Sequence, residues 1–153
     1  MCAYSKIKNE PFIIFLADDD ETDRLIFSEA FEEIKIQTSI RAFNDGVDLM
    51  NYLNTGDTLP HLLFLDLNMP KKNGLQCLKE IKANKKFQEI CIAIYSTSSS
   101  EVDIESTFRE GANVYIKKPD DFNVLKSLLE KAVMVGYQYQ HPPFNKENFL
   151  LRI

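Results

Sequence analysis

The stretch "PFIIFLADDD", residues 11–20, decides the fold, because a run of apolar residues ends abruptly in three aspartates. Residues 11–17 are almost all apolar, which is typical of a strand that is buried on both faces of a parallel sheet. The acids that follow have two explanations. They either lead into a helix, whose N-terminus favours acidic residues, or they bind a cation. This stretch leaves both explanations open, and the rest of the chain has to distinguish them.

Apolar runs alternate with segments of helical period along the whole chain. The predicted strands are 11–17, 38–43, 61–66, 90–96 and 113–117, and the predicted helices are 21–35, 44–56, 73–84, 100–110 and 121–135. Strands that alternate with helices predict an α/β fold, a doubly wound parallel sheet with right-handed crossovers and helices on both faces. Because the first, third and fourth strands are the most apolar, they should be central. The sequence therefore predicts a flavodoxin-like (βα)5 fold with strand order 2-1-3-4-5.

Each predicted helix has an apolar side that should face the sheet. The residues expected there are Ile26, Phe27, Ala30, Phe31, Ile34, Leu49, Met50, Leu53, Leu75, Leu78, Ile81, Ile104, Phe108, Phe122, Leu125, Leu128, Leu129 and Val133.

Length and composition indicate one globular domain. The chain has 153 residues, 44% of them hydrophobic, and its 18 basic and 23 acidic residues give a net charge of −5. This balance argues against direct nucleic-acid binding, which rewards clustered Lys and Arg. No apolar run approaches the roughly 20 residues that span a bilayer, so we expect no membrane insertion. Three cysteines without a CxxC pair favour a reduced, cytoplasmic setting. Two histidines are too few for a histidine-rich metal site.

Polar side chains stand at the carboxyl ends of four of the predicted strands, where ligands bind in such sheets. Asp18 and Asp19 follow the first strand, Asp66 ends the third, Ser96 ends the fourth, and the fifth ends in Lys117 and Lys118. Each has an ordinary explanation by itself: Asp66 could begin a turn, Ser96 could cap the next helix, and Lys118 could end a strand in solvent. Because the carboxyl ends of parallel strands meet at one edge of the sheet, their coincidence predicts a common site.

Four motifs carry a resemblance to a known family. "LADDD", "LLFLDLNMPKKNG", "IAIYSTS" and "GANVYIKKP" occur in this order, and the chain resembles a response regulator receiver domain of two-component signalling over about residues 11–135. The resemblance is to the stand-alone, chemotaxis-type receivers. Cys91 departs from it, since many relatives have proline there.

The resemblance implies a role for individual residues. It makes Asp66 the phosphoacceptor, Lys118 the site lysine because it precedes Pro119, and Ser96 rather than Thr97 the hydroxyl switch residue. Tyr115 is implied as the aromatic switch residue, although an amphipathic edge position would explain it as well. The implied cofactor is Mg²⁺, and its implied ligands are Asp18, Asp19, Asp66 and the backbone carbonyl of Asn68. Asp20 is expected outside the site, as a cap of the first helix.

The same resemblance implies partners and an organisation of the chain. A sensor histidine kinase or a histidine phosphotransfer protein would donate the phosphoryl group, and an unidentified protein would receive the signal. We expect an N-terminal extension over 1–10, the receiver domain over 11–135, and a tail over 136–153 that is too short for an output domain. The tail should be disordered or fold onto its own domain, or it should instead form a dimer arm. The kinase would dock near the first helix, where Ile26, Phe27 and Ala30 lie.

Two alternatives remain open at this point. A degenerate receiver would serve only as a binding module, although every expected acceptor-site residue is present. A phosphatase of the haloacid-dehalogenase type would be an enzyme, but its D-x-D-x-[TV] motif lacks the second aspartate after Asp66. The preferred hypothesis is not an enzyme but a phosphoacceptor, with autocatalytic phosphorylation and dephosphorylation only.

Overall fold

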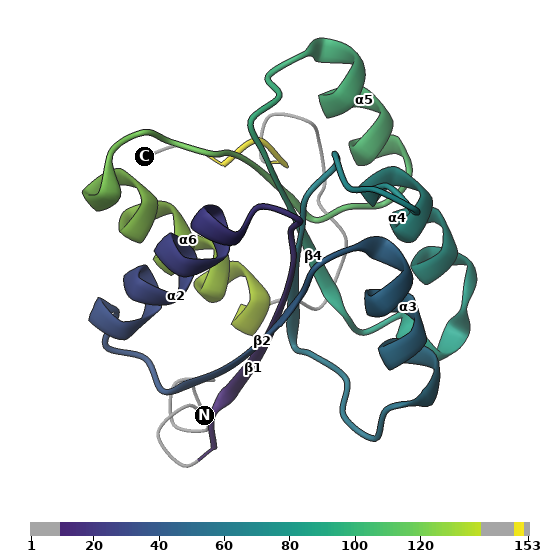
Figure 1. The fold of residues 1–153 in the computed structure, drawn as a ribbon, viewed down its shortest axis with the longest axis horizontal. Coiled ribbons are helices and arrows are strands. Elements are labelled where there is room, and N and C mark those ends of the chain that lie inside the picture. The colour runs from purple at the N-terminus through teal and green to yellow at the C-terminus, as the bar shows by residue number, and fades with distance from the viewer. Residues whose placement is uncertain (1–9, 139–148, 152–153) are drawn as a thin grey trace.

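The computed structural model describes residues 10–138 and 149–151 (Figure 1). Within these residues a five-stranded parallel sheet has the order β2-β1-β3-β4-β5, which confirms the predicted fold. The strands are β1 (Phe12–Ala17), β2 (Thr38–Phe43), β3 (Leu62–Leu65), β4 (Cys91–Ser96) and β5 (Val114–Lys117). The helices are α2 (Glu21–Glu33), α3 (Gly46–Thr55), α4 (Gly74–Ala83), a 3-10 turn at Lys85–Phe87, α5 (Glu101–Arg109) and α6 (Phe122–Gln138).

Helices cover both faces of the sheet. Figure 1 shows α2 and α6 on one face and α3, α4 and α5 on the other. Phe27, Phe31 and Leu128 belong to the hydrophobic core of the first face, while Leu78 and Ile104 belong to that of the second. Two buried layers on one sheet explain why β1, β3 and β4 are almost entirely apolar.

The two edge strands differ in burial. The first four residues of β2 alternate between partly buried and exposed, Ala42 is exposed, and Phe43 at the end of the strand is buried. In β5, by contrast, Val114, Tyr115 and Ile116 are all buried. Tyr115 is 0% exposed, so it is not a half-exposed amphipathic residue. Phe149, near the end of the chain, packs against the Tyr115 ring and helps to cover it.

Side-chain caps fix the starts of the helices that follow the strands. Asp20 accepts a hydrogen bond from the Asp23 N–H and caps α2, as predicted. Ser100, not Ser96, caps α5 by accepting from the Asp103 N–H. Caps of this type satisfy N–H groups that have no partner within the helix.

The outward face of α2 differs from the sequence prediction. Ile26 is 36% exposed and Leu25 is 60% exposed, whereas Phe27, Ala30 and Phe31 are buried. Phe27, Ala30 and Phe31 stand three and four residues apart and already fill the side that faces the sheet. Ile26 is rotated by about 100° from Phe27, so it lies at the margin of the buried stripe.

The ends of the chain lie largely outside the described residues. Residues 1–9 of the predicted N-terminal extension and 139–148 and 152–153 of the predicted tail belong to that part. Helix α6 continues through Gln138, three residues beyond the predicted helix 121–135. Among the described helices, none is long and apolar enough to cross a membrane.

Candidate functional site

Three aspartates meet at the carboxyl end of the sheet. Asp18, Asp19 and Asp66 each offer a carboxylate oxygen, and these oxygens all lie within 4.8 Å of one another. Strand register is the cause: Ala17 pairs with Leu65 in the parallel ladder, so the next residue of each strand leaves the sheet at the same level. The Asp66 N–H donates to the Ala17 carbonyl at 3.0 Å and fixes this juxtaposition. The structure thus brings these residues together as the sequence predicts.

Lys118 is the cation of the cluster. Its Nζ donates to Asp18 Oδ2 at 2.7 Å and to Asp23 Oδ2 at 2.9 Å, and it lies 3.6 Å from Asp66 Oδ2. Burial opposes the charge of Lys118, but the hydrogen bonds that Lys118 donates to Asp18 and Asp23 outweigh this effect, so the pKa of Lys118 lies above its usual value. Lys117 is exposed, and the choice of lysine made from Pro119 therefore names the one that reaches the aspartates.

Asp66 is a buried acid in an acidic environment. Burial raises its pKa to about 6; nearby Lys118 lowers the pKa, and the charge of Asp18 raises it further. The Asn68 N–H donates to Asp66 Oδ1 at 3.3 Å, and this bond also favours the carboxylate form. A second cation near this group would favour its ionised form, because an opposite charge stabilises the carboxylate.

Asp18 is held from several sides. Its Oδ1 accepts the Asp20 N–H at 2.9 Å, and its side chain is fully buried. Arg24 Nη1 donates to the backbone carbonyl of Asp18 at 2.8 Å. With Lys118 on the other carboxylate oxygen, Asp18 has one fixed orientation toward Asp66.

Ser96 and Tyr115 are joined through one loop residue, Ser98. Ser96 is fully buried at the end of β4, and its Oγ accepts the Ser98 N–H at 3.1 Å. The Tyr115 hydroxyl donates to the Ser98 carbonyl at 2.8 Å. Burial raises the pKa of Tyr115 above its usual value, so the phenol stays protonated as this donor. Thr97, in contrast, is exposed.

Two residues of the site are not among the predicted ones. Asp23 stands on the first turn of α2 and shares Lys118 with Asp18. The sequence could have indicated Asp23, because it stands five residues after Asp18, in the first turn of a helix that starts next to the aspartate cluster. Tyr95 places its ring 5.1 Å from the Lys118 Nζ, at cation–π distance, but in the sequence it is one more residue of an apolar strand.

The donor set suits a hard divalent cation. Mg²⁺ takes oxygen ligands, usually one or two carboxylates with waters completing the shell. Asp18 and Asp66 are buried and Asp19 is exposed, so the cluster combines fixed carboxylates with one that faces solvent. The residues present therefore fit Mg²⁺.

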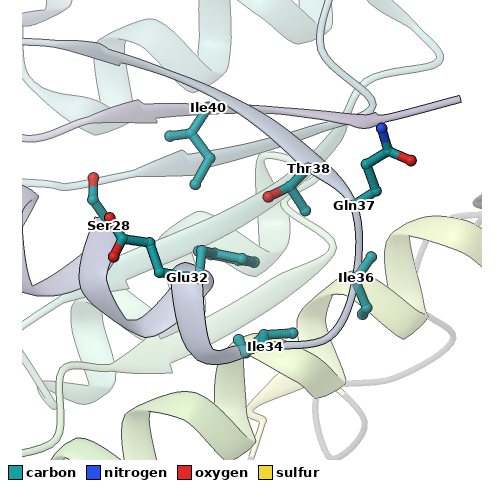
Figure 2. A pocket seen from close by; sticks show the side chains of 8 residues that line it. Ser28, Glu32, Ile34, Ile36, Gln37, Thr38 and Ile40 are labelled. Carbon is teal, nitrogen blue, oxygen red and sulfur yellow. The ribbon is translucent and has the colours of Figure 1, made fainter.

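A groove of about 450 Å³ lies away from this cluster (Figure 2). It runs between α2 and β2 and is lined mainly by apolar and neutral side chains, among them Ile34, Ile36 and Ile40. Glu32 is its one charged lining residue. The groove offers no group for acid–base or metal chemistry comparable to the aspartate cluster, so the cluster is the candidate functional site.

Comparisons with known proteins agree with this site. The family model of the response regulator receiver domain matches residues 14–130. The probable methanogenesis regulatory protein FilR2 of Methanothrix harundinacea is 31% identical over 126 residues, which cover 80% of this chain and 81% of that protein. The response regulator Rcp1 of Synechocystis is 28% identical over 127 residues, 80% of this chain and 86% of its own.

Two solved structures share the fold along almost their whole length. The Mn²⁺-bound form of response regulator Rcp1 matches with a TM-score of 0.76 and 26% identity, covering 87% of this chain and 99% of that one. The phosphorylated cyanobacterial phytochrome response regulator RcpA matches with a TM-score of 0.76 and 28% identity, covering 89% and 100%. With this match over most of the chain, and with the aspartate cluster at the strand ends, the chain belongs to the response regulator receiver domains, a family of signalling proteins that bind Mg²⁺ through an acidic cluster.

Proposed function

We propose that the chain accepts a phosphoryl group on Asp66 from a phosphohistidine of a sensor histidine kinase or a histidine phosphotransfer protein. One observation carries the proposal: three carboxylates lie within 4.8 Å of one another, and a buried lysine lies 3.6 Å from Asp66. Such a cluster repels itself unless cations neutralise it, and phosphoryl transfer requires charge neutralisation and positioning above all.

The transfer step is a displacement at phosphorus. An Asp66 carboxylate oxygen attacks the phosphorus of the phosphohistidine and forms the O–P bond of an acyl phosphate. The N–P bond breaks, and its electron pair stays on the imidazole nitrogen of the partner. The step needs the ionised form of Asp66, which neighbouring positive charge favours.

Asp18, Asp19, Asp66 and the backbone carbonyl of Asn68 are the proposed Mg²⁺ ligands. The ion would neutralise the charge of the transferred phosphoryl group. The support from the chain is the chemistry of its donors: the carboxylates are hard oxygen ligands at a spacing that one ion can bridge.

Lys118 and Ser96 are the proposed contacts of the remaining phosphoryl oxygens. The Lys118 ammonium already lies beside Asp66, and Ser96 ends the neighbouring strand β4. The Ser96 hydroxyl accepts the Ser98 N–H and keeps its own hydrogen for a further acceptor. Hydrogen bonds to charged groups contribute roughly 1.5–3 kcal/mol, enough to shift a two-state population, and Tyr115 is the proposed aromatic switch residue.

We further propose that the output is a protein contact rather than DNA binding. The net charge of −5 disfavours a nucleic-acid surface. The downstream protein is unidentified, and a homodimer is the alternative output. The boundaries 1–10, 11–135 and 136–153 and the cytoplasmic location stay predictions.

Incubation with acetyl phosphate and Mg²⁺ tests the proposal. We expect a base-labile adduct of one phosphoryl group on the wild type and none on Asp66→Asn. Asp20→Asn is the matched control, because it makes the same change of charge at the exposed cap of α2 and should leave the adduct intact. An adduct that persists in Asp66→Asn contradicts the assignment.

The same assay separates the alternatives. A degenerate receiver would form no adduct with acetyl phosphate or with a phosphorylated histidine protein. A phosphatase would instead turn over unrelated phosphomonoesters continuously, with loss of turnover in Asp66→Asn.

A further inference from the structure

The described end of the chain lies on the outer edge of the sheet. Leu150 forms a parallel bridge with Tyr115, and the Leu151 N–H donates to the Tyr115 carbonyl at 2.9 Å. This segment, Phe149–Leu151, is drawn yellow in Figure 1. An edge strand presents unpaired backbone groups that a further segment can bind, and here the chain itself supplies a short segment that makes one β-bridge there.

Phe149 anchors the segment. Its side chain is 0% exposed, and its ring lies 5.9 Å from the Tyr115 ring and 5.3 Å from the Phe108 ring of α5. Leu150 packs against the same core as Phe149, and Leu151 packs against the core on the opposite face of the sheet. The segment therefore covers Tyr115 on the side where β5 has no further strand.

Tyr115 connects this segment to the acceptor site. Its hydroxyl donates to the Ser98 carbonyl, and the Ser98 N–H donates to Ser96 Oγ. The Ser98 hydroxyl donates to Asp103 on the first turn of α5. A continuous series of contacts thus runs from Phe149 through Tyr115 and Ser98 to Ser96.

We propose that Phe149–Leu151 is a resident segment on the β5 edge whose docking strengthens phosphoryl binding at Asp66, with Phe149 as a positioning residue that acts through Tyr115. This inference rests on the proposed function of Asp66. With the segment docked, Tyr115 is buried and holds Ser98, and Ser98 holds the Ser96 hydroxyl ready to donate. A donor that is fixed before the ligand arrives binds it more tightly than one that must first be ordered. Coupling is reciprocal, so a phosphoryl group on Asp66 tightens the docking.

Binding of beryllofluoride with Mg²⁺, a phosphoryl analogue, measures the effect of the docked segment on the affinity of the Asp66 site. Isothermal titration calorimetry of Phe149→Ala should show affinity about five-fold weaker than the wild type, or weaker still. Val102→Ala is the matched control: Val102 is an apolar residue of α5 that is 75% exposed, and its removal should leave the affinity unchanged.

Hydrogen exchange of the Leu151 amide measures the reciprocal effect, which is the effect of the phosphoryl analogue on docking of the segment. In the wild type, beryllofluoride with Mg²⁺ should slow this exchange, and in Asp66→Asn it should not. Phe149→Ala should raise the exchange without ligand. A residue that only stabilised the fold would raise exchange throughout the sheet and would not make Leu151 respond to the ligand.

A double-mutant cycle tests the connection through Tyr115. Tyr115→Phe keeps the ring that contacts Phe149 and removes the hydrogen bond to Ser98. In that background Phe149→Ala should have little further effect on beryllofluoride affinity, because the contact series is already broken. Fully additive effects would overturn the route through Tyr115.

The remaining outcomes separate this inference from the proposed function. Wild-type affinity in Phe149→Ala would overturn the coupling while Asp66 remains the acceptor. Absence of binding that depends on Asp66 would overturn the proposed function, and the coupling with it. Leu151 exchange that slows with protein concentration would place the segment on a second copy and overturn docking within one chain.

Discussion

Asp66 carries an electrostatic conflict that its own fold creates. Burial raises its pKa to about 6, so the folded chain holds this proton at a pH where the unfolded chain, with a pKa of 3.8, has lost it. The contribution of Asp66 to the free energy of unfolding therefore falls as pH rises from about 4 to about 6, and it stays reduced above that range. A cation bound beside Asp66 would relieve this conflict, because an opposite charge stabilises the carboxylate.

Asp66→Asn should stabilise the metal-free protein at neutral pH. We expect a gain on the order of 1–3 kcal/mol at pH 7–8, which disappears toward pH 4, because the amide has no charge to bury. Urea unfolding of both proteins in a chelator, over this pH range, measures the difference. Asp20→Asn should follow the wild type, and an equal stability of wild type and Asp66→Asn at every pH would contradict the electrostatic account.

Asp23 competes for Lys118. Because its carboxylate holds the Lys118 Nζ at 2.9 Å, Asp23→Asn should release the lysine toward Asp66. We expect beryllofluoride with Mg²⁺ to bind more tightly, by about two- to ten-fold. In the variant, Lys118 no longer has to give up its charge-assisted hydrogen bond to Asp23 before it contacts the ligand. Calorimetric titration checks this, with Asp20→Asn as the control of equal charge. Weaker binding would instead mean that Asp23 holds Lys118 in its working position.

At the scale of elements, the loop between β3 and α4 sets the place of Asp66. Its residue Lys71 has a φ of 66°, in the left-handed region that lysine rarely adopts. The loop then enters α4 at Gly74, which approaches the Asp66 backbone closely. Both features show that a tight turn is needed directly after Asp66.

Lys71→Asn should stabilise the fold by about 0.5–1 kcal/mol, because asparagine tolerates the left-handed conformation better than lysine. The ion pair with Asp45 that is lost contributes little, since the Lys71 side chain is 66% exposed. Thermal or urea unfolding measures the gain. Lys71→Gln removes the same charge without the conformational preference, and a gain of equal size there would contradict the explanation.

Gly74→Ala should destabilise the fold and disturb Asp66. A Cβ at this position would meet the Asp66 carbonyl oxygen at 2.1 Å and the Leu67 Cα at 2.8 Å, and backbone atoms cannot move away cheaply. We expect a loss of about 2–3 kcal/mol in urea unfolding and a slower reaction with acetyl phosphate. Gly136→Ala in α6, where the nearest atom is the end of the Phe12 ring, should be close to neutral.

At the scale of the molecule, the sheet collects negative charge at one edge, and a cation that binds there stabilises the whole fold. A ligand at about 100 times its dissociation constant adds about 2.7 kcal/mol to the free energy of unfolding. Mg²⁺ at such a saturating concentration should therefore raise the melting temperature of the wild type by several degrees. Asp19→Asn, a change at an exposed residue, should lose most of this shift, and Asp20→Asn should keep it. An undiminished shift in Asp19→Asn would place the cation elsewhere.

The sequence by itself determined the sheet, its strand order and the residues at its carboxyl edge. Apolar strands and helical periods are local patterns, and parallel strands that share an edge bring Asp18, Asp66 and Lys118 together whatever the loops do. The resemblance to receiver domains also indicated Ser96 over Thr97, because the Ser96 hydroxyl comes directly at the end of the strand. It indicated Lys118 over Lys117, because Lys118 precedes Pro119.

Only the tertiary structure decided how neighbouring elements share these groups. Three features depend on the distance and rotation between elements that are separate in the sequence. They are the hydrogen bond from Lys118 to Asp23, the exposure of Ile26 on α2, and the ring contact between Phe149 and Tyr115. A periodic pattern gives the direction of a side chain within its own element, but it carries no information on which side chain from another element arrives there. For that reason the cluster of aspartates with Lys118 could be predicted, while the packing of Phe149 on Tyr115 could not.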